Sequence, residues 1–185
     1  MAKEKNISVY LCFLLRHHPE EANLDMDRHG WVSVKQLVDN INRVGKYQLT
    51  VQQSKQIVET DNKGRYRFNV DETWIRVCQG HSIPWVQPEL QYFSPPEFLY
   101  HGTTCSAWRK IRKSGAIRKM NRHAVHMQAD EEKAWQSANR WHQDAVVLKI
   151  AAQKMSQDGI MFGVSDNDVW CTEQVDVRYV CQVLE

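Results

Sequence analysis

The sequence predicts an α+β fold built from two small lobes, and three observations support this. Apolar residues at helical spacing fill most of the first 60 residues, and an alternating pattern typical of a β-hairpin follows them. The second half alternates strand-like and helix-like segments. Four of the five prolines fall between His81 and Glu97, where no periodicity is visible. We therefore expect an N-terminal lobe at residues 1–82, a linker at 83–97 and a C-terminal lobe at 98–185.

The N-terminal lobe is predicted to begin with three short helices. Apolar residues repeat at helical intervals over residues 7–15, and Pro19 ends that helix. Ser33 and Thr50 are N-cap residue types, and each precedes a further set of apolar residues at helical spacing. The second and third helices should therefore start just after Ser33 and Thr50.

Arg16 and His17 lie at the C-terminal end of the first predicted helix, in the run Leu15-Arg16-His17-His18-Pro19. Cations at this end complement the partial negative charge of the helix, which would be a purely structural role. The other interpretation is an anion site, because further Arg and His residues follow in the second half of the chain. Both interpretations remain open on these residues alone.

A hairpin follows, with apolar residues alternating over 66–70 and again over 73–77 around a turn at Asp71-Glu72. Three helices and a hairpin make a winged-helix-like arrangement. The alternation places Arg65 and Arg67 on the solvent face. Two guanidinium groups on one face could bind a phosphate, although exposed strand arginines often only increase solubility.

The C-terminal lobe should mix helices and strands. The strands are expected at residues 98–100, 125–127, 145–150 and 178–183, with helices around 108–111 and at about 130–141. Tyr100-His101-Gly102-Thr103 is predicted at a strand end, where the missing Cβ of Gly102 would let a ligand approach the backbone. A motif this short is weak by itself.

Composition and charge limit the class of protein. The net charge is only +2, but the stretch from Phe98 to Ala129 has no Asp or Glu and includes seven Lys and Arg residues, which predicts a locally basic surface. The five cysteines show no C-x-x-C spacing, so neither a disulfide framework nor a zinc site is indicated. No apolar run reaches the roughly 20 residues of a membrane span. We expect a soluble cytoplasmic protein that needs no metal.

Eight short motifs follow one another along the chain: Leu15-Arg16-His17-His18-Pro19-Glu20, Gly30-Trp31-Val32, Arg67-Phe68, Ile75-Arg76, Gln79-Gly80-His81-Ser82, Tyr100-His101-Gly102-Thr103, Arg122-His123-Ala124-Val125-His126 and Val169-Trp170-Cys171-Thr172. In this order they resemble the NAD-dependent RNA 2′-phosphotransferase family (Tpt1/KptA), with the bacterial KptA branch the best match. The resemblance spans nearly the whole chain, and a set in this order is far more specific than any one member.

The resemblance implies a winged-helix-like RNA lobe and an ADP-ribosyltransferase-like lobe that binds NAD. The family is linked to tRNA splicing, and the substrate implied is RNA with an internal 2′-phosphate. That phosphate attacks the nicotinamide-bearing ribose carbon of NAD, giving an RNA-2′-phospho-ADP-ribose intermediate. The neighbouring 2″-OH then attacks phosphorus. The products would be 2′-OH RNA, ADP-ribose 1″,2″-cyclic phosphate and nicotinamide, so NAD is consumed.

By motif position, the resemblance implies distinct roles for the matched residues. His17 would shuttle a proton in the second step, and Arg16 would stabilise its transition state. Arg67 and Arg122 would hold the phosphate. The NAD-binding group comprises His101, Gly102, Thr103, His126 and Val169, and the further RNA or phosphate contacts are Arg65, Arg76, Gln79 and Ser82.

Three departures from the family pattern are visible. Arg65 competes with Arg67 for the phosphate, and His126-Met127-Gln128 lacks a hydroxyl that the family usually carries there. Cys171 replaces a Leu. Val169 is not a departure, because the resemblance implies an aliphatic residue at this position in this branch of the fold, where many other ADP-ribosyltransferases have a Glu. The missing carboxylate disfavours transfer to a poorly nucleophilic acceptor.

Two other functions remain open. The chain could cap terminal RNA or DNA phosphates with ADP-ribose, stopping before the second step. It could also be a catalytically silent RNA-binding protein, which the presence of Arg16, His17, Arg67 and Arg122 argues against. The identity of the products would separate these alternatives.

Overall fold

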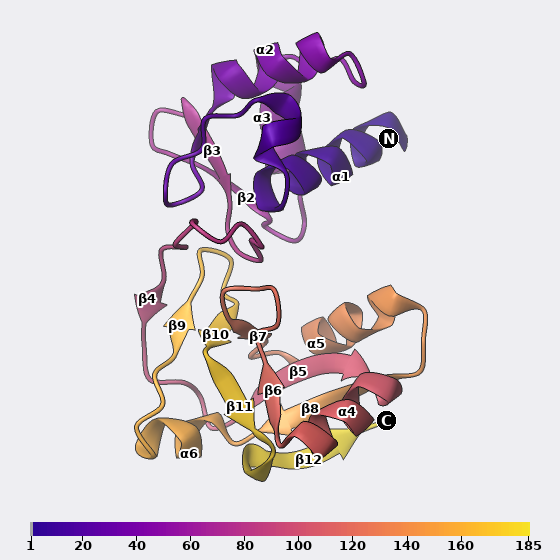
Figure 1. The fold of residues 1–185 in the computed structure, drawn as a ribbon, viewed down its shortest axis with the longest axis vertical. Coiled ribbons are helices and arrows are strands. Elements are labelled where there is room, and N and C mark those ends of the chain that lie inside the picture. Colours follow the sequence, from indigo (N-terminus) through magenta and orange to yellow (C-terminus); the bar gives the residue numbers. More distant parts are fainter. Residues whose placement is uncertain (1) are drawn as a thin grey trace. The chain divides into compact units, whose positions relative to one another are not determined.

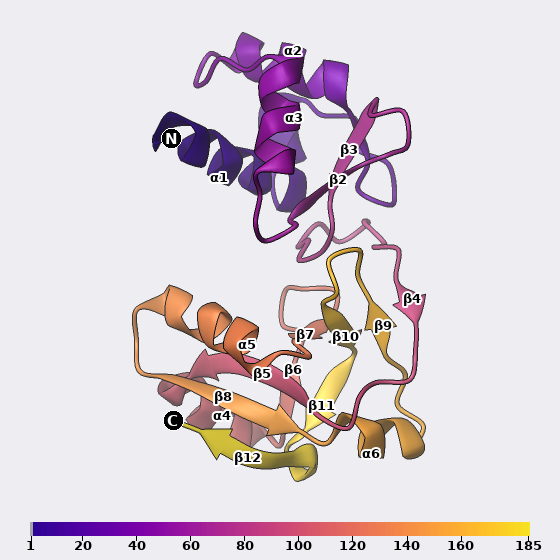
Figure 2. The same cartoon turned by 180° about the vertical axis from the view of Figure 1, so that it is seen from behind.

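The chain divides into two compact units in a computed structural model that describes residues 2–185, with side chains described from residue 6. Unit 1 ends at Glu89 and unit 2 runs from Leu90 to Glu185 (Figures 1 and 2). The division falls within the predicted linker, but this segment is not a free tether. Ile83 and Val86 are buried in unit 1, and β4 (Gln91–Tyr92) belongs to a sheet of unit 2.

Unit 1 combines helices with one small sheet, so the α+β prediction is confirmed for this half. Its sheet is antiparallel, with β3 in the centre between β1 and β2. The elements are α1 (Ala2–Arg16), a 3₁₀ turn (Pro19–Ala22), β1 (Val32–Ser33), α2 (Val34–Val44), α3 (Val51–Glu59), β2 (Tyr66–Phe68) and β3 (Trp74–Val77).

Local sequence signals set the helix boundaries as predicted. The Ser33 side chain accepts a hydrogen bond from the Gln36 backbone N–H at the start of α2. Thr50 and Gln53 form a reciprocal capping box at the start of α3, which satisfies backbone N–H groups that have no partner inside the helix. Gly45, at φ +79°, ends α2 in the left-handed conformation that glycine adopts without strain.

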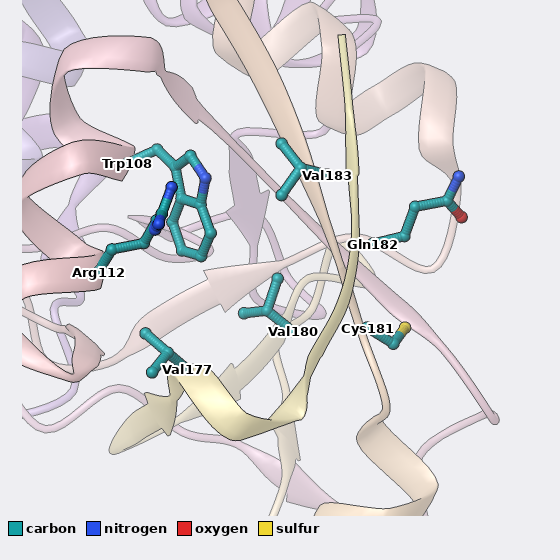
Figure 3. A pocket seen from close by; sticks show the side chains of 7 residues that line it. All are labelled: Trp108, Arg112, Val177, Val180, Cys181, Gln182 and Val183. Carbon is teal, nitrogen blue, oxygen red and sulfur yellow. The ribbon is translucent and has the colours of Figure 1, made fainter.

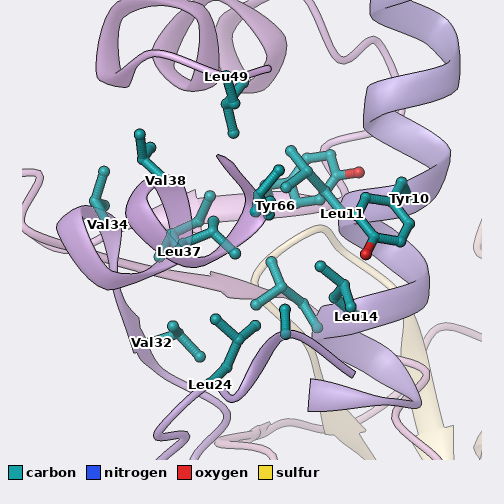
Figure 4. Packing of buried hydrophobic residues seen from close by; sticks show 14 of the residues in the cluster. Tyr10, Leu11, Leu14, Leu24, Val32, Val34, Leu37, Val38, Leu49 and Tyr66 are labelled. Carbon is teal, nitrogen blue, oxygen red and sulfur yellow. The ribbon is translucent and has the colours of Figure 1, made fainter. Parts of the chain in front are cut away.

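The core of unit 1 lies between these helices and the inner face of the sheet (Figure 4). The fully buried residues Leu11, Leu14, Leu37 and Ile75 come from α1, α2 and β3. Tyr66 on β2 joins them, and its hydroxyl donates to the backbone oxygen of Ser8 at 2.5 Å. This bond ties the hairpin to the middle of α1 and so holds the helix against the sheet.

The first strand of the hairpin was predicted two residues too long, at 66–70, whereas β2 spans Tyr66–Phe68. Val70 was assigned to the alternating pattern, but it lies in the turn and is fully exposed. Asn69 ends the pairing because its side-chain oxygen accepts a hydrogen bond from the Trp74 backbone N–H. A side chain thus replaces a backbone partner at this position. β2 therefore stops at Phe68.

Unit 2 also mixes helices and strands, with three small antiparallel sheets. The elements after β4 are β5 (Leu99–Thr104), α4 (Cys105–Ser114), β6 (Ala116–Arg118), β7 (Val125–Met127), α5 (Glu131–Ala138), a 3₁₀ turn (Asn139–Trp141), β8 (Ala145–Ile150), α6 (Ala152–Gln157), β9 (Gly163–Val164), β10 (Trp170–Thr172), β11 (Gln174–Asp176), a 3₁₀ turn (Val177–Tyr179) and β12 (Val180–Leu184). In one sheet, β8 lies between β5 and β12. The second sheet has the order β4-β9-β10-β7, and the third pairs β6 with β11.

Two predictions for unit 2 require correction. The last strand was expected from residue 178, but Arg178 and Tyr179 belong to the 3₁₀ turn because the Asp176 side chain caps it by accepting from the Arg178 N–H. The His101 motif lies inside β5 rather than at a strand end, because that strand continues to Thr104. Thr104 then caps α4.

Candidate functional site

The end of α1 brings two of the predicted site residues into contact. Nδ1 of His17 lies 2.8 Å from Oγ of Ser82, although the residues are 65 positions apart. The Ser82 backbone N–H also donates to the Arg16 carbonyl oxygen at 3.0 Å. The loop that carries Ser82 turns at Gly80, whose φ of +85° suits glycine. This loop is therefore fastened to the helix end at two points.

Arg16 has an unsatisfied donor at the same helix end. Its Nε is buried and has no hydrogen-bond partner among the described residues. A buried donor left unpaired costs about 1–3 kcal/mol, and more for a charged group. The last turn of a helix favours the cation but does not satisfy this N–H. An anionic acceptor, such as a phosphate oxygen, would do so.

The three arginines of the hairpin differ in their surroundings. Arg65 pairs with the carboxylate of Asp61. Arg76 is buried, forms an ion pair with Glu89, and lies with its guanidinium 4.5 Å from the ring centre of Trp31. Arg67 is exposed on β2, directly opposite Arg76.

These surroundings change the interpretation of two predicted phosphate contacts. Arg65 was expected on the solvent face together with Arg67, but it is half-buried because Asp61, with only 4% of its side chain exposed, holds it. Arg76 likewise lies under Trp31 rather than at the surface. Gln79 is half-buried in the loop that follows β3. Arg67 is the arginine of the hairpin that the structure leaves exposed.

In unit 2, His101 and His126 are brought together by neighbouring strands. Nδ1 of His101 lies 2.9 Å from the backbone oxygen of His126. A carbonyl oxygen only accepts, so Nδ1 carries the proton. Burial lowers the pKa of His101, and the hydrogen bond to His126 opposes this only in part. The imidazole is therefore neutral at pH 7, and its Nε2 is an acceptor.

Gly102 is required by packing within the unit. A Cβ at this position would lie 2.1 Å from the backbone oxygen of Ala134 in α5. We expected the bare backbone to admit a ligand, but α5 occupies the space where the side chain would be. The adjacent Thr103 is buried and pairs with Val146 on β8. Gly102 thus allows α5 to pack closely on β5.

The other predicted residues of unit 2 lie on strands and loops near this sheet. Arg122 is exposed in the turn that leads into β7, the strand that carries His126. Tyr100 is half-buried and exchanges two backbone hydrogen bonds with Gln128, each 2.8 Å long. Val169 is buried before β10, where its carbonyl accepts from the Ser165 N–H at 3.0 Å. His101, His126 and Tyr100 therefore come together through β5 and β7.

Each unit has a hollow lined by residues that the structure describes. In unit 2 a groove of 380 Å³ lies between α4 and β12, with Trp108 and Arg112 on one side and Val180 and Val183 on the other (Figure 3). Its lining, all within the described chain, contains none of the predicted site residues. The hollow in unit 1 measures 880 Å³ and includes His17 and Ser82.

Neither the thiol of Cys171 nor a metal cluster adds a further reactive group among the described residues. Cys171 is buried, and burial raises the pKa of its thiol to about 12, so it is not a thiolate at neutral pH. Within residues 2–185, no group of three or more His, Cys, Asp or Glu is placed to hold a metal ion. The helices described also include none that is long and apolar enough to cross a membrane.

The predicted basic surface is centred on α4. Four of its seven cations are exposed on this helix: Arg109, Lys110, Arg112 and Lys113. Lys119 contributes less to the positive charge of this surface, because its Nζ lies 2.6 Å from a carboxylate oxygen of Glu173.

Sequence reasoning missed the contact between Ser82 and His17. It assigned Ser82 to RNA contact from motif position, whereas the structure shows its hydroxyl on the His17 ring. It also missed Asp61, which determines the environment of Arg65. The spacing of four residues between Asp61 and Arg65 was an available signal, because opposite charges this close in sequence often pair.

Comparison with known proteins gives a consistent result. The family described as RNA 2′-phosphotransferase, Tpt1/KptA matches residues 2–174. A protein from Fusobacterium nucleatum named probable RNA 2′-phosphotransferase is 37% identical over 180 residues, which cover 97% of this chain and 99% of that protein. Proteins with the same name from Rhizobium leguminosarum and Burkholderia pseudomallei are 39% and 38% identical, covering 96% and 94% of this chain and 93% and 92% of theirs.

Proposed function

This chain belongs to the RNA 2′-phosphotransferase, Tpt1/KptA family, and we propose that it removes an internal 2′-phosphate from RNA by transfer to NAD. The transferase activity follows from the family and from the names of the relatives. The use of NAD, the two-step route and the residue roles are the parts proposed here. Unit 1 would act as the winged-helix-like RNA lobe and unit 2 as the ADP-ribosyltransferase-like NAD lobe.

The observation that carries this proposal is the chemistry at the end of α1. The unsatisfied Nε of Arg16 and the imidazole of His17 lie on consecutive residues. Together they offer a permanent cation and an imidazole that can donate or accept a proton. Both are required by a phosphoryl group that must first be bound and must then release an alcohol as its leaving group.

The first step needs positioning more than acid–base chemistry. The RNA 2′-phosphate attacks the ribose carbon that bears nicotinamide, and the C–N bond to nicotinamide breaks. Because the phosphate is already ionised at pH 7, no base is needed. Arg67, exposed on β2, and Arg122, exposed before β7, are the proposed phosphate ligands, since guanidinium forks match phosphate oxygens.

The second step requires proton transfer. The ribose 2″-OH attacks phosphorus and loses its proton, while the RNA 2′ oxygen leaves and gains one. Since Ser82 engages Nδ1 of His17, proton exchange would use Nε2. The Ser82 hydroxyl can rotate to donate or to accept, so it can support either protonation state of the ring. Arg16 would offset the charge that develops on the phosphate oxygens.

His101 is the residue of unit 2 whose surroundings give the strongest support to the proposed NAD binding. The neutral His101 offers Nε2 as an acceptor, which suits a ribose hydroxyl donor. Gly102 contributes through close packing of α5, which fixes β5 and with it the His101 ring. Thr103, His126 and Val169 remain proposed neighbours of NAD.

The test is incubation of the purified protein with an oligoribonucleotide bearing one internal 2′-phosphate, with and without NAD. Mass spectrometry of the RNA and the small molecules should show loss of the phosphate only with NAD, together with ADP-ribose 1″,2″-cyclic phosphate. RNA that retains the phosphate joined to ADP-ribose would mean that the second step is missing. Unchanged RNA would refute the proposal.

A further inference from the structure

The hollow in unit 1 extends well beyond His17. It measures 880 Å³, which is within the range of about 300–1,000 Å³ common for small-ligand sites. From the RNA 2′-phosphotransferase function proposed above, we infer that this hollow holds a nucleoside that adjoins the phosphorylated ribose. Its base would stack on Trp85 and be read by Asp25.

The position of the hollow links it to the reaction. His17 and Ser82 form one part of its wall, and Asp25, Gln36, Asn40 and Arg43 form another. A phosphate beside His17 therefore places one neighbouring nucleotide of the same strand at the hollow. The lining is mostly polar, as suits a nucleoside rather than an apolar ligand.

Trp85 provides a stacking surface that is held in place. It is 49% exposed at a turn, an unusual position for so large an aromatic side chain. The residues on either side of the turn, Ile83 and Val86, are 5% and 1% exposed and anchor it in unit 1. Bases stack on such rings whatever their identity, so Trp85 would contribute affinity without specificity.

Asp25 supplies a base-reading group with a fixed orientation. Its carboxylate accepts from the Gln36 side-chain amide at 2.6 Å, and its backbone N–H donates to the Gln36 side-chain oxygen at 3.0 Å. A carboxylate only accepts hydrogen bonds. It can therefore bind the exocyclic amino group of cytosine, whereas the O4 of uracil would face it as a second acceptor.

Arg43 extends this surface toward the RNA backbone. One of its terminal nitrogens donates to the Asn40 side-chain oxygen at 3.3 Å, and Asn40 is in turn held by donating to the carbonyl of Asn23 at 2.8 Å. The other guanidinium N–H groups could reach a phosphate of the strand. The hollow thus combines a stacking ring, an acceptor for an amino group and a cation.

The first experiment measures binding of fluorescently labelled 2′-phosphorylated trinucleotides to the full-length chain by anisotropy, without NAD. Trp85→Ala should weaken binding about tenfold, the usual scale for loss of one stacked base. Trp141→Ala is the matched control, because Trp141 is 64% exposed and lies in unit 2 outside the hollow. Circular dichroism verifies that both variants fold.

A second experiment tests base reading with an isosteric change. The neighbour on the 5′ side, and in a separate series on the 3′ side, is changed from cytosine to uracil. At one of the two positions the wild type should bind the cytosine form about fivefold more tightly, in line with the value of one good base contact. Asp25→Asn should abolish this preference, since an amide can donate to uracil O4. Because Asp25 is exposed, this variant also serves if Trp85→Ala does not fold.

The outcomes separate this inference from the proposed function. Equal binding by Trp85→Ala and Trp141→Ala, or no difference between cytosine and uracil at either position, would overturn the inference even if phosphate removal is observed. If the base preference and its loss in Asp25→Asn are found without NAD-dependent phosphate removal, the hollow is an RNA site and the proposed reaction fails.

Discussion

The two units hold their candidate residues in different ways. In unit 1, Arg16 and His17 lie at the end of α1 and Ser82 lies in a loop. Side-chain and backbone hydrogen bonds join the loop to the helix end, and none of the three residues belongs to the hydrophobic core of the unit. In unit 2, His101 and Gly102 lie inside β5, between β7, β8 and α5. The candidate residues of unit 1 thus lie outside the packing that holds the unit together, whereas those of unit 2 take part in it.

This difference means that substitutions should separate chemistry from stability. Changes to the candidate residues of unit 1 should alter reaction steps and leave the free energy of unfolding nearly unchanged. Changes to the candidate residues of unit 2 should destabilise the fold together with NAD binding.

The largest effect is expected for His17→Ala. Without a proton shuttle the second step should slow by about 10²–10⁴-fold, the usual contribution of general acid–base catalysis, while the first step changes little. Rapid-quench sampling should then show accumulated RNA-2′-phospho-ADP-ribose. The denaturant midpoint should match that of the wild type, and wild-type turnover would remove His17 from the mechanism.

The next effect is on stability, in Gly102→Ala. The new Cβ would meet backbone atoms of α5, so we expect destabilisation of about 3 kcal/mol or more, since overpacking against backbone is not easily relieved. Gly45→Ala is the control: its φ is +79° and nothing lies within 4 Å, so it should cost only about 1–2 kcal/mol. Urea unfolding compares them. Equal losses would contradict the packing role of Gly102.

Substitution of Arg67 and substitution of Arg65 should differ in their effect on the rate of the first step. Arg67→Ala should slow single-turnover nicotinamide release by about 10–100-fold, as expected for loss of one charge-assisted hydrogen bond. Arg65→Ala should slow it by less than about threefold, because Asp61 already holds that guanidinium. The reverse order would assign the phosphate to Arg65.

The smallest effect is the pH dependence of stability from His101. Burial lowers its folded pKa below the unfolded value of about 6.5, so between these values the unfolded chain binds more protons. Stability from this group is complete above about pH 6.5 and falls on acidification toward the folded pKa, by at most about 1.4 kcal/mol per pH unit. His101→Gln should flatten this part of the profile. If stability depends on pH with the same slope in the variant, a group other than His101 is responsible.

Sequence reasoning was most accurate where local chemistry decides the structure. The starts of α2 and α3 follow from Ser33 and Thr50, whose side chains cap the adjacent backbone. The α+β class and the position of His17 at the end of α1 follow from the periodic apolar pattern. Such signals act over a few residues and are visible in one sequence.

The parts that it missed depend on tertiary contacts. The contact between Ser82 and His17 joins residues 65 positions apart, and no local pattern predicts it. Glycine is required at position 102 because the backbone of Ala134, in α5, lies too close for a side chain. Strands β9, β10 and β11 have two or three residues each, too few to show a period. The residue roles of both units remain proposals from motif position and geometry.

If the RNA phosphate itself is transferred to NAD, a label on its phosphorus atom follows the transfer directly. An oligoribonucleotide carrying radioactive phosphorus at one internal 2′ position is mixed with the wild-type chain and NAD, and the products are separated over time. We expect the label to pass through an RNA-linked ADP-ribose species into ADP-ribose 1″,2″-cyclic phosphate, and to stay on the RNA when NAD is absent. Label released as inorganic phosphate, or released without NAD, would contradict it.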